Sequence, residues 1–265
     1  MAYRLTDYSF PEFNEMVKDV PTVILPVGLI EQHGYHLPLG TDIYNANVPI
    51  ELGFDRLNAF IAPTLNYCFS GGGFKGTMNV NPLNFGLFVT EICKEFVGMG
   101  FKNIVVFMGH LGSENIDALK LSLQVFLRDE ANKDIAVIVT GLDYMSKTYE
   151  KLATPDPVDG GDFHAGHVET SLMMYWKPEL VHMEKLQMDE PEAAHMLRTD
   201  QDWYAQRTKA FDNPQCCDRV IQRPELKVGV MGFPERATAE LGKKVTDESL
   251  DYFEKLINDL NARVK

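Results

Sequence analysis

Short apolar runs alternate with segments of helical periodicity along most of this chain. Continuously apolar strands separated by helices are typical of a parallel sheet that is covered on both faces. The pattern therefore predicts an α/β fold over residues 1–265, a single compact domain with a mainly parallel central sheet flanked by helices on both faces. The predicted strands are TVILPVG (22–28), AFIAPTL (59–65), NIVVFMG (103–109) and DIAVIVTGL (134–142).

Apolar residues at helical spacing predict the helices that cover this sheet. They lie at 9–18, 44–57, 84–100, 113–130, 168–176 and 247–264. The least regular part of the chain is 186–225, which is polar and interrupted by prolines. Its pattern fits either an insertion or an oligomer contact, and no linker divides the chain.

Polar and ionisable side chains gather where predicted strands end. GLIEQHGYHLPLGTD (28–42) follows the first strand, GHLGSEN (109–115) follows the third, and GGDFHAGHVETS (160–171) ends the loop after the fourth. The carboxyl ends of parallel strands meet at one edge of a sheet, where ligands bind in folds of this kind. We therefore expect the three segments to converge.

The converging segments combine carboxylates with imidazoles, as in Glu31, His33, Asp42 and His110. This donor set suits Zn, Mn, Fe or a related divalent ion, and the absence of thiolates from it argues against a structural zinc site. The inventory fits a two-metal site, which can hold a hydroxide and polarise a carbonyl. The alternative is ordinary hydrogen-bonding histidines.

The other histidines divide into two groups. His182 and His195 are expected to be ordinary loop residues. His36 and His167 lie beside the candidate ligands, and each is expected either to support a ligand or to face the substrate.

The glycine-rich segment SGGGFKG (70–76) does not fit a helix or strand interior. It is either a flexible surface loop or a place where backbone amides, including those of Gly72 and Gly73, approach a substrate closely and stabilise an oxyanion. Lys75 lies in the same loop. No Walker sequence is present, so nucleotide binding through a P-loop is not expected.

Charge, cysteine content and the lack of long apolar segments exclude several classes of protein. The formal net charge of −13 argues against nucleic-acid binding, which needs a basic surface. The four cysteines form no CxxC pair and are expected to be reduced thiols. The N-terminal residues MAYRLTDYSFPEF lack the basic-then-apolar pattern of a signal peptide, and no apolar stretch reaches about 18 residues. We expect a cytoplasmic protein that does not bind membranes.

The motifs LPVGLIEQHGYHLPLGTD, FKGT, GHLGSEN, HAGHVETS and GVMGFPERATAELGKK follow one another in this order. Together they resemble the creatininase (creatinine amidohydrolase) family over residues 20–245. The resemblance implies a compact α/β fold, a homo-oligomer that is often a hexamer, and two divalent metal ions at the carboxyl edge of the sheet. It also implies a hydrolase that acts on a small molecule.

The resemblance also assigns roles by position. Glu31 would bind one ion and His33 the other, Asp42 would bridge both, and His110 would join the ion of Glu31. The fifth ligand is either Glu169 or Glu114, and Glu169 is favoured because Gly112 replaces the carboxylate that creatininase has after its His.

The residues that act on the substrate are also implied by the resemblance. His164 matches a histidine that faces the substrate and transfers a proton, and Glu169 is placed with it in the catalytic group. Asp162 and His167 belong to the polar loop beside His164 and are expected to hydrogen-bond the substrate.

Creatininase encloses a flat ring with loop tryptophans, whereas this chain has only Trp176 and Trp203. The substrate is therefore expected to be small, polar and hydroxylated, the best candidate being a cyclic polyhydroxy ketone or diketone such as 3-dehydro-scyllo-inosose, which is opened by hydrolysis. The alternatives are an amidohydrolase that acts on a lactam or formamide and a non-catalytic ligand-binding member of the family.

Overall fold

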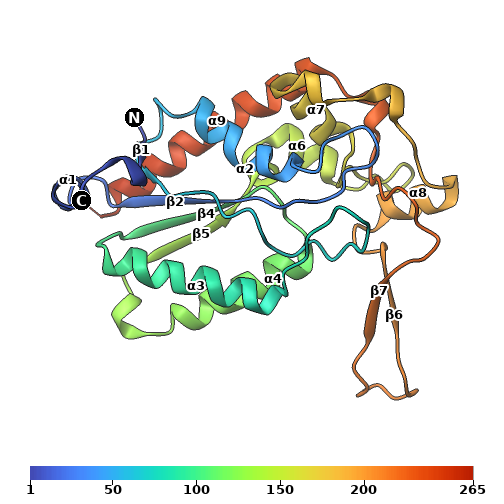
Figure 1. Ribbon diagram of the computed structural model, residues 1–265, viewed down its shortest axis with the longest axis horizontal. Coiled ribbons are helices and arrows are strands. Elements are labelled where there is room, and N and C mark those ends of the chain that lie inside the picture. The colour runs from blue at the N-terminus through green and yellow to red at the C-terminus, as the bar shows by residue number, and fades with distance from the viewer. Residues whose placement is uncertain (265) are drawn as a thin grey trace.

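The apolar runs predicted as strands form a parallel sheet in the computed structural model, which describes residues 1–264 (Figure 1). The strand order is β1-β3-β2-β4-β5, and all four neighbouring pairs are parallel. β2 and β4 lie at the centre of the sheet and are buried along their whole length. The strands are β1 (Tyr3–Arg4), β2 (Thr22–Val27), β3 (Phe60–Ile61), β4 (Asn103–Met108) and β5 (Ala136–Thr140).

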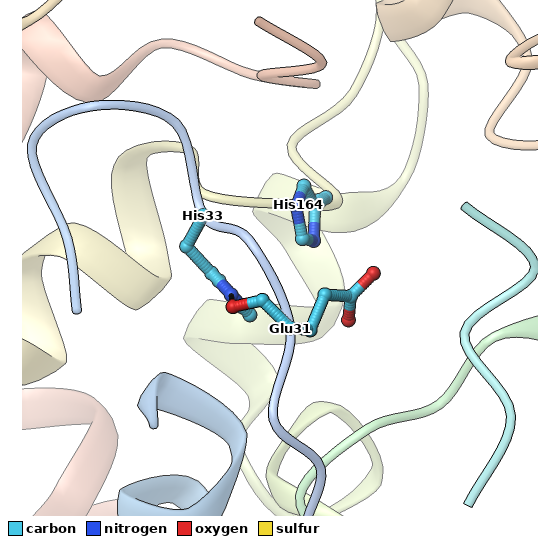
Figure 2. A group of neighbouring side chains, drawn as sticks. All are labelled: Glu31, His33 and His164. Atoms are coloured by element: carbon cyan, nitrogen blue, oxygen red, sulfur yellow. Dashed lines mark hydrogen bonds between the residues drawn. The ribbon is translucent and has the colours of Figure 1, made fainter. Parts of the chain in front are cut away.

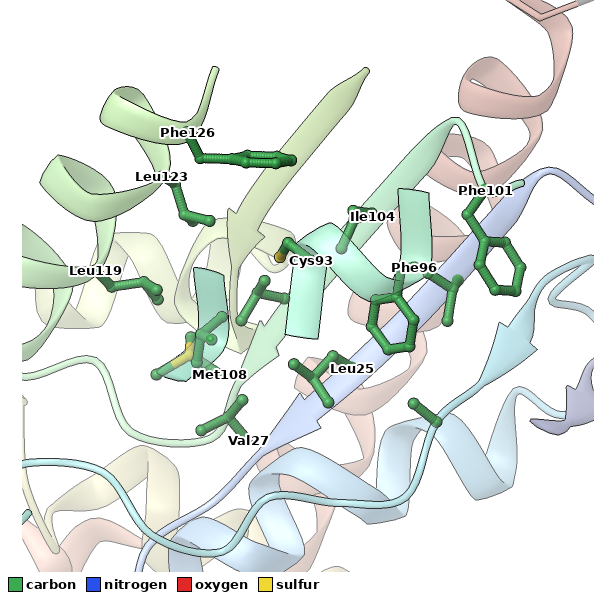
Figure 3. Close-up of a cluster of buried hydrophobic side chains, with 14 of the residues drawn as sticks. Leu25, Val27, Cys93, Phe96, Phe101, Ile104, Met108, Leu119, Leu123 and Phe126 are labelled. Carbon is green, nitrogen blue, oxygen red and sulfur yellow. The ribbon is translucent and has the colours of Figure 1, made fainter. Parts of the chain in front are cut away.

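Alternate residues of the central strands point to opposite faces of the sheet, as the pleat requires. Leu25 and Ile104 face a core that α3 and α4 close with residues such as Cys93 and Leu119 (Figure 3). Val105 faces the opposite core, which α2, α7 and α9 close. The predicted α/β fold with helices on both faces is therefore confirmed.

The helices lie on the two sides of the sheet, with α3 and α4 on one side and α2, α7 and α9 on the other (Figure 1). The α-helices are α1 (Phe10–Met16), α2 (Thr41–Leu52), α3 (Pro82–Gly98), α4 (Ser113–Phe126), α5 (Leu142–Met145), α6 (Lys147–Ala153), α7 (His167–Trp176), α8 (Pro191–Thr199) and α9 (Ala239–Ala262). Short 3-10 helices lie at Leu5–Asp7, Glu130–Asn132, Pro178–Leu180, Met183–Lys185 and Pro234–Arg236.

Several predicted boundaries differ from the observed ones. The strand predicted over 59–65 is regular only at Phe60–Ile61, because Pro63 cannot donate a ladder hydrogen bond. The helix predicted over 247–264 begins at Ala239, where Thr238 accepts a hydrogen bond from the Leu241 amide. α2 begins at Thr41 rather than at 44, so that Asp42 lies in its first turn.

The irregular region 186–225 contains elements that were not predicted, namely α8 and an antiparallel hairpin of β6 (Ala205–Thr208) and β7 (Arg219–Gln222). The hairpin projects away from the sheet and its helices (Figure 1). Among the described residues, no helix is both long and apolar enough to cross a membrane.

Candidate metal centre and cavity

The loop after β2 returns the chain to the edge of the sheet. The Glu31 amide donates to the Leu39 carbonyl at 2.9 Å, and α2 begins two residues later. This closure places Asp42 next to the end of β4. Gly109 follows β4 directly, and a side chain at this position would collide with the backbone of Asp42. The close approach of two elements therefore requires glycine.

Asp42 lies between the buried imidazole of His33 and the largely buried imidazole of His110. Its Oδ1 is 3.3 Å from His33 Nε2, and its Oδ2 is 3.6 Å from His110 Nδ1. Glu31 Oε2 lies 2.9 Å from His110 Nδ1. One carboxylate thus presents one oxygen to each side of the cluster, which is the arrangement that a bridging ligand needs.

Glu169 completes the His33 side. Its Oε2 is 3.6 Å from His33 Nε2, and the side chain is buried in the first turn of α7. Ligand atoms of Glu31, Asp42 and His110 lie within 4.8 Å of one another, and so do those of His33, Asp42 and Glu169. Glu114 belongs to neither group, because it is partly exposed and lies 3.5 Å from Arg207.

The donor set fits divalent cations. Glu31 Oε2, His33 Nε2 and Asp42 Oδ2 are buried and make no hydrogen bond. Buried polar atoms are normally satisfied, so a group of unsatisfied ones calls for a ligand. Carboxylate oxygens and imidazole nitrogens facing one another are the donors that Zn and Mn take.

The ionisation of the cluster without metal is consistent with this fit. Burial opposes the charged imidazoles, but the carboxylates outweigh it and raise the pKa of His110 to about 9 and that of His33 well above its usual value. Burial also opposes the charged form of Glu169, yet His33 lowers the Glu169 pKa to about 2. The carboxylates therefore favour the protonated imidazoles in the metal-free cluster, while burial raises the pKa of Asp42 to about 7.

His164 lies beside this cluster. Its ring is 4.3 Å from the His33 ring, centre to centre, and its Nε2 is 2.9 Å from the Gln32 carbonyl oxygen. Figure 2 shows Glu31 and His33 on one loop and His164 on another segment that approaches from the opposite side. Burial, aided by the charge on His33, lowers the pKa of His164, which favours the neutral ring.

A cavity of about 750 Å³ opens over the cluster. Glu31, Asp42, His110, His164 and Glu169 form part of its wall. Among the described residues (1–264), no lysine or arginine lines it. The outer wall carries the carboxyl groups of Asp143, Glu150, Asp200 and Asp202 and the rings of Phe74, Tyr144, Tyr149, Phe163 and Tyr204.

Two predicted substrate contacts are corrected by this geometry. His36 is fully buried, its Nε2 is 3.0 Å from Thr170 Oγ1, and it does not line the cavity. The carboxylate of Asp162 borders the cavity but accepts hydrogen bonds from the amides of His167, Val168 and Phe233. Both side chains hold α7 in place rather than presenting free groups to a substrate.

Most of the other positions predicted to contact substrate also lie outside the cavity. Lys75, Gly73 and His167 do not line the cavity, whereas Gly72 does. The predicted oxyanion role of the loop amides is not supported for Gly71 to Gly73. Their N–H groups donate to Asn79, Ser70 and Gln222 respectively.

Sequence reasoning missed the polar residues that contact the cluster from other elements. Ser70 donates to Glu31, and Asn45 donates to Glu169. Tyr149, Tyr204 and Gln222 line the cavity from α6 and from the base of the hairpin. Of these residues, only Asn45 could have been identified from its position in the sequence. It lies about one helical turn after Asp42, on the same face of α2.

A parallel α/β sheet that holds this donor set at the carboxyl edge of its strands is the framework of a metal-dependent hydrolase. A sequence model of the Creatininase family, described as creatinine amidohydrolase, matches residues 6–257. The chain therefore belongs to the creatininase family.

Curated relatives agree with this family. The chain is 26% identical to the 3-dehydro-scyllo-inosose hydrolase of Thermotoga maritima, over 95% of this chain and 81% of that protein. It is 29% identical to the creatinine amidohydrolase of Pseudomonas putida, over 64% of this chain and 70% of that protein. It is also 29% identical to the mycofactocin precursor peptide peptidase of Mycolicibacterium smegmatis, over 93% of this chain and 85% of that protein.

Solved structures show the same fold. A crystal structure of creatininase superimposes with a TM-score of 0.73 at 21% identity, covering 96% of each chain. A structure titled "Creatininase Mn" gives a TM-score of 0.73 at 21% identity and covers 98% of each chain. A creatininase variant solved as a Zn–Zn type gives 0.72 at 22% identity, also over 98% of each chain.

Proposed function

We propose that this metal-dependent hydrolase opens a small cyclic, hydroxylated ketone or diketone of the 3-dehydro-scyllo-inosose type. The observation that carries the proposal is the cavity, in which a buried carboxylate–imidazole cluster meets walls that carry carboxylates, tyrosines and Gln222 but no lysine or arginine. The first relative described above is a hydrolase of such a compound.

Two divalent ions, Zn, Mn or Fe, would be held by the cluster. Glu31 and His110 would bind one ion, His33 and Glu169 the other, and Asp42 would bridge them, as its two oxygens are directed to opposite sides. Such ions supply a nucleophilic hydroxide at neutral pH and polarise a carbonyl.

His164 would act as the proton carrier. His164 Nε2 lies 2.9 Å from the Gln32 carbonyl oxygen, which only accepts, and 3.3 Å from Gln32 Nε2, which only donates. The shorter contact favours a proton on Nε2, with the lone pair kept on Nδ1. A neutral ring that borders the cavity is able to take a proton at Nδ1 and return it to the leaving carbon or nitrogen. The hydrogen bond to Gln32 holds the ring in this tautomer.

The cavity wall favours a neutral substrate over a phosphorylated one. Asp143, Glu150, Asp200 and Asp202 would repel a phosphate, and no lysine or arginine of the lining offsets them. Carboxylates, tyrosines and Gln222 can hydrogen-bond hydroxyl groups. A site built for hydroxyl groups discriminates strongly against analogues that lack them.

The proposal is tested by kinetics on protein loaded with Mn²⁺ or Zn²⁺. Cyclic polyhydroxy ketones and diketones, formamides, lactams and creatinine are compared side by side, and the first class is expected to give the highest kcat/KM. Neither tryptophan lines the cavity, so creatinine is expected to be a poor substrate. Creatinine turnover at about 10⁴ M⁻¹s⁻¹ or above, the lower end for efficient enzymes, would contradict the proposal.

An amidohydrolase that acts on a planar lactam or formamide is the second candidate. The observation in its favour is the set of aromatic rings in the cavity, including Tyr149, Phe163 and Tyr204, since planar rings gain binding from aromatic faces. The same kinetic comparison separates the two candidates. A non-catalytic role would be indicated by purified protein that retains no metal and hydrolyses none of these compounds.

The assembly expected from the family resemblance, a homo-oligomer that is often a hexamer, stays a prediction. Light scattering coupled to size-exclusion chromatography measures the mass of the particle directly. A particle of one chain would contradict it.

A further inference from the structure

We propose that two buried hydrogen-bond donors, Asn45 and Ser70, separately position the two halves of the metal centre. Asn45 positions the half formed by His33 and Glu169, and Ser70 positions the half formed by Glu31 and His110. This inference rests on the metal assignment in the proposed function.

Asn45 holds the outer oxygen of the Glu169 carboxylate. Its Nδ2 donates to Glu169 Oε1 at 3.0 Å, and the side chain is 4% exposed. Glu169 Oε2 accepts from the Ala165 amide at 2.7 Å and faces His33. With each oxygen held by its own donor, the carboxylate plane is fixed and Oε2 stays directed at His33.

The orientation of the Asn45 amide follows from its neighbours. Nδ2 also lies 3.4 Å from the Gly109 carbonyl, and both this carbonyl and Glu169 are acceptors. A flipped amide would set its oxygen against them, so Nδ2 must face them. Asn45 thus connects α2, which carries Asp42, with α7 and with the backbone before His110.

Ser70 orients the Glu31 carboxylate in the same way, through one hydrogen bond to one of its oxygens. Its Oγ lies 2.5 Å from Glu31 Oε1 and accepts a hydrogen bond from the Gly72 amide at 3.0 Å. Because the Gly72 amide occupies a lone pair of Oγ, the hydroxyl proton is directed to Glu31. Glu31 Oε1 is thereby engaged, while Oε2, 2.9 Å from His110, remains free for a cation.

The two donors therefore act on different carboxylates and do not share a partner. Asn45 has no hydrogen bond to the Glu31–His110 half, and Ser70 has none to the His33–Glu169 half. Partners that orient metal ligands typically contribute a factor of about 10–100 to metal affinity. Removing one donor should weaken one ion selectively.

The test compares Asn45→Ala and Ser70→Ala with Asn47→Ala as the matched control. Asn47 lies on the same helix, and its hydrogen bonds go to Ile43 and Thr64, away from the cluster. Each protein is loaded with Zn²⁺ alone, both affinities are measured by chelator competition, and the occupancy of each site is refined from anomalous scattering in crystals. Thermal unfolding of the metal-free proteins checks that each variant folds.

We expect Asn45→Ala to lower Zn²⁺ affinity about 10–100-fold at the His33–Glu169 site alone, and Ser70→Ala to do so at the Glu31–His110 site alone. Both sites of Asn47→Ala should match wild type. If Asn45→Ala does not fold, Asn45→Leu keeps about the same volume and removes the donor that faces Glu169 without adding a charge.

Equal weakening of both sites, or no weakening, in the folded Asn45 and Ser70 variants would overturn the inference. It would leave the proposed function standing, provided that wild-type protein still holds its ions. Wild-type protein that binds no Zn²⁺ would overturn the proposed function itself and this inference with it.

Discussion

The inner and outer parts of the cavity are built in different ways. Glu31, His33, Asp42 and His110 of the inner cluster come from segments that follow the central strands β2 and β4, whereas Glu169 comes from α7. Glu31, His33 and Asp42 are all at least 95% buried. The outer wall comes from the α5–α6 segment (143–155), from Phe74 and Phe163, and from 199–226, which includes α8's last residue and the base of the projecting hairpin. Its carboxyl groups at Asp200 and Asp202 are exposed or partly exposed.

This difference suggests that the inner part of the cavity binds the metal ions and the outer part selects the substrate. The inner donors are fixed by the packed core of the sheet, so that they can change little without loss of the metal centre. The 199–226 part of the outer wall is attached by side-chain contacts such as Ser113 to Asp202 and Gln222 to Gly73. We therefore expect inner substitutions to act on metal binding and outer ones to act on substrate choice.

The largest effect should come from the inner residue shared by both halves. Asp42→Ala is expected to lose both ions and nearly all activity, because each Asp42 oxygen faces a different imidazole. Elemental analysis measures the metal content, and circular dichroism checks the fold. Two tightly held ions per chain in this variant would refute the bridging role.

The next effect distinguishes the two candidates for the fifth ligand. Glu169→Gln should weaken the ion at His33 more than the ion at Glu31, because Gln keeps the shape and removes the charge. Glu114→Gln should leave both ions bound, since Glu114 is turned toward Arg207. The measurement is Zn²⁺ affinity by chelator competition. The reverse pattern would show that the segment after His110 moves to bring Glu114 to the metal.

The inner cluster should also make metal affinity depend on pH. The pKa of His110 is raised to about 9, so an entering cation must displace its proton at neutral pH. The apparent affinity for the metal ion should therefore rise with pH and level off above about 9. The number of protons released on metal binding should fall over the same pH range. Calorimetry in buffers of different ionisation enthalpy measures this release. Affinity that is constant between pH 6 and about 9 would contradict protonated imidazoles.

Substitutions in the outer wall should affect activity less than those in the inner cluster, and they should act on substrate binding rather than on metal binding. Asp202→Asn keeps the shape of the group that Ser113 contacts and removes one negative charge from the cavity. We expect a several-fold change in KM, weaker exclusion of anionic inhibitors such as inorganic phosphate, and unchanged Zn²⁺ affinity. A loss of metal comparable to that of Glu169→Gln would remove the proposed division between the two regions.

The smallest effect should come from Lys75, which the sequence suggested as a substrate contact but which does not line the cavity. Lys75→Ala is expected to leave kcat/KM within about twofold of wild type, the size typical of surface substitutions. Steady-state kinetics with the best substrate provides the measurement. A tenfold rise in KM would mean that the 70–76 loop reaches the substrate after all.

The sequence determined the parts of this protein that depend on local pattern. Continuous apolar runs specify buried parallel strands, and ligands follow the carboxyl ends of such strands, so the fold and the convergence of Glu31, His33, Asp42 and His110 could be predicted. The two central strands matched the prediction most closely, because burial on both faces leaves the strongest hydrophobic signal.

Only the tertiary structure decided which side chains complete the site. Ser70 and Asn45 lie next to carboxylates 39 and 124 positions away in the chain, and no local pattern records such contacts. Asp162 and His36 look like binding residues in sequence, but their hydrogen bonds are used within the protein. The hairpin is short and mostly exposed, and α8 buries only Ala194 and Leu197, so few apolar residues mark these elements in the sequence. The 199–226 part of the outer wall therefore depends on long-range packing.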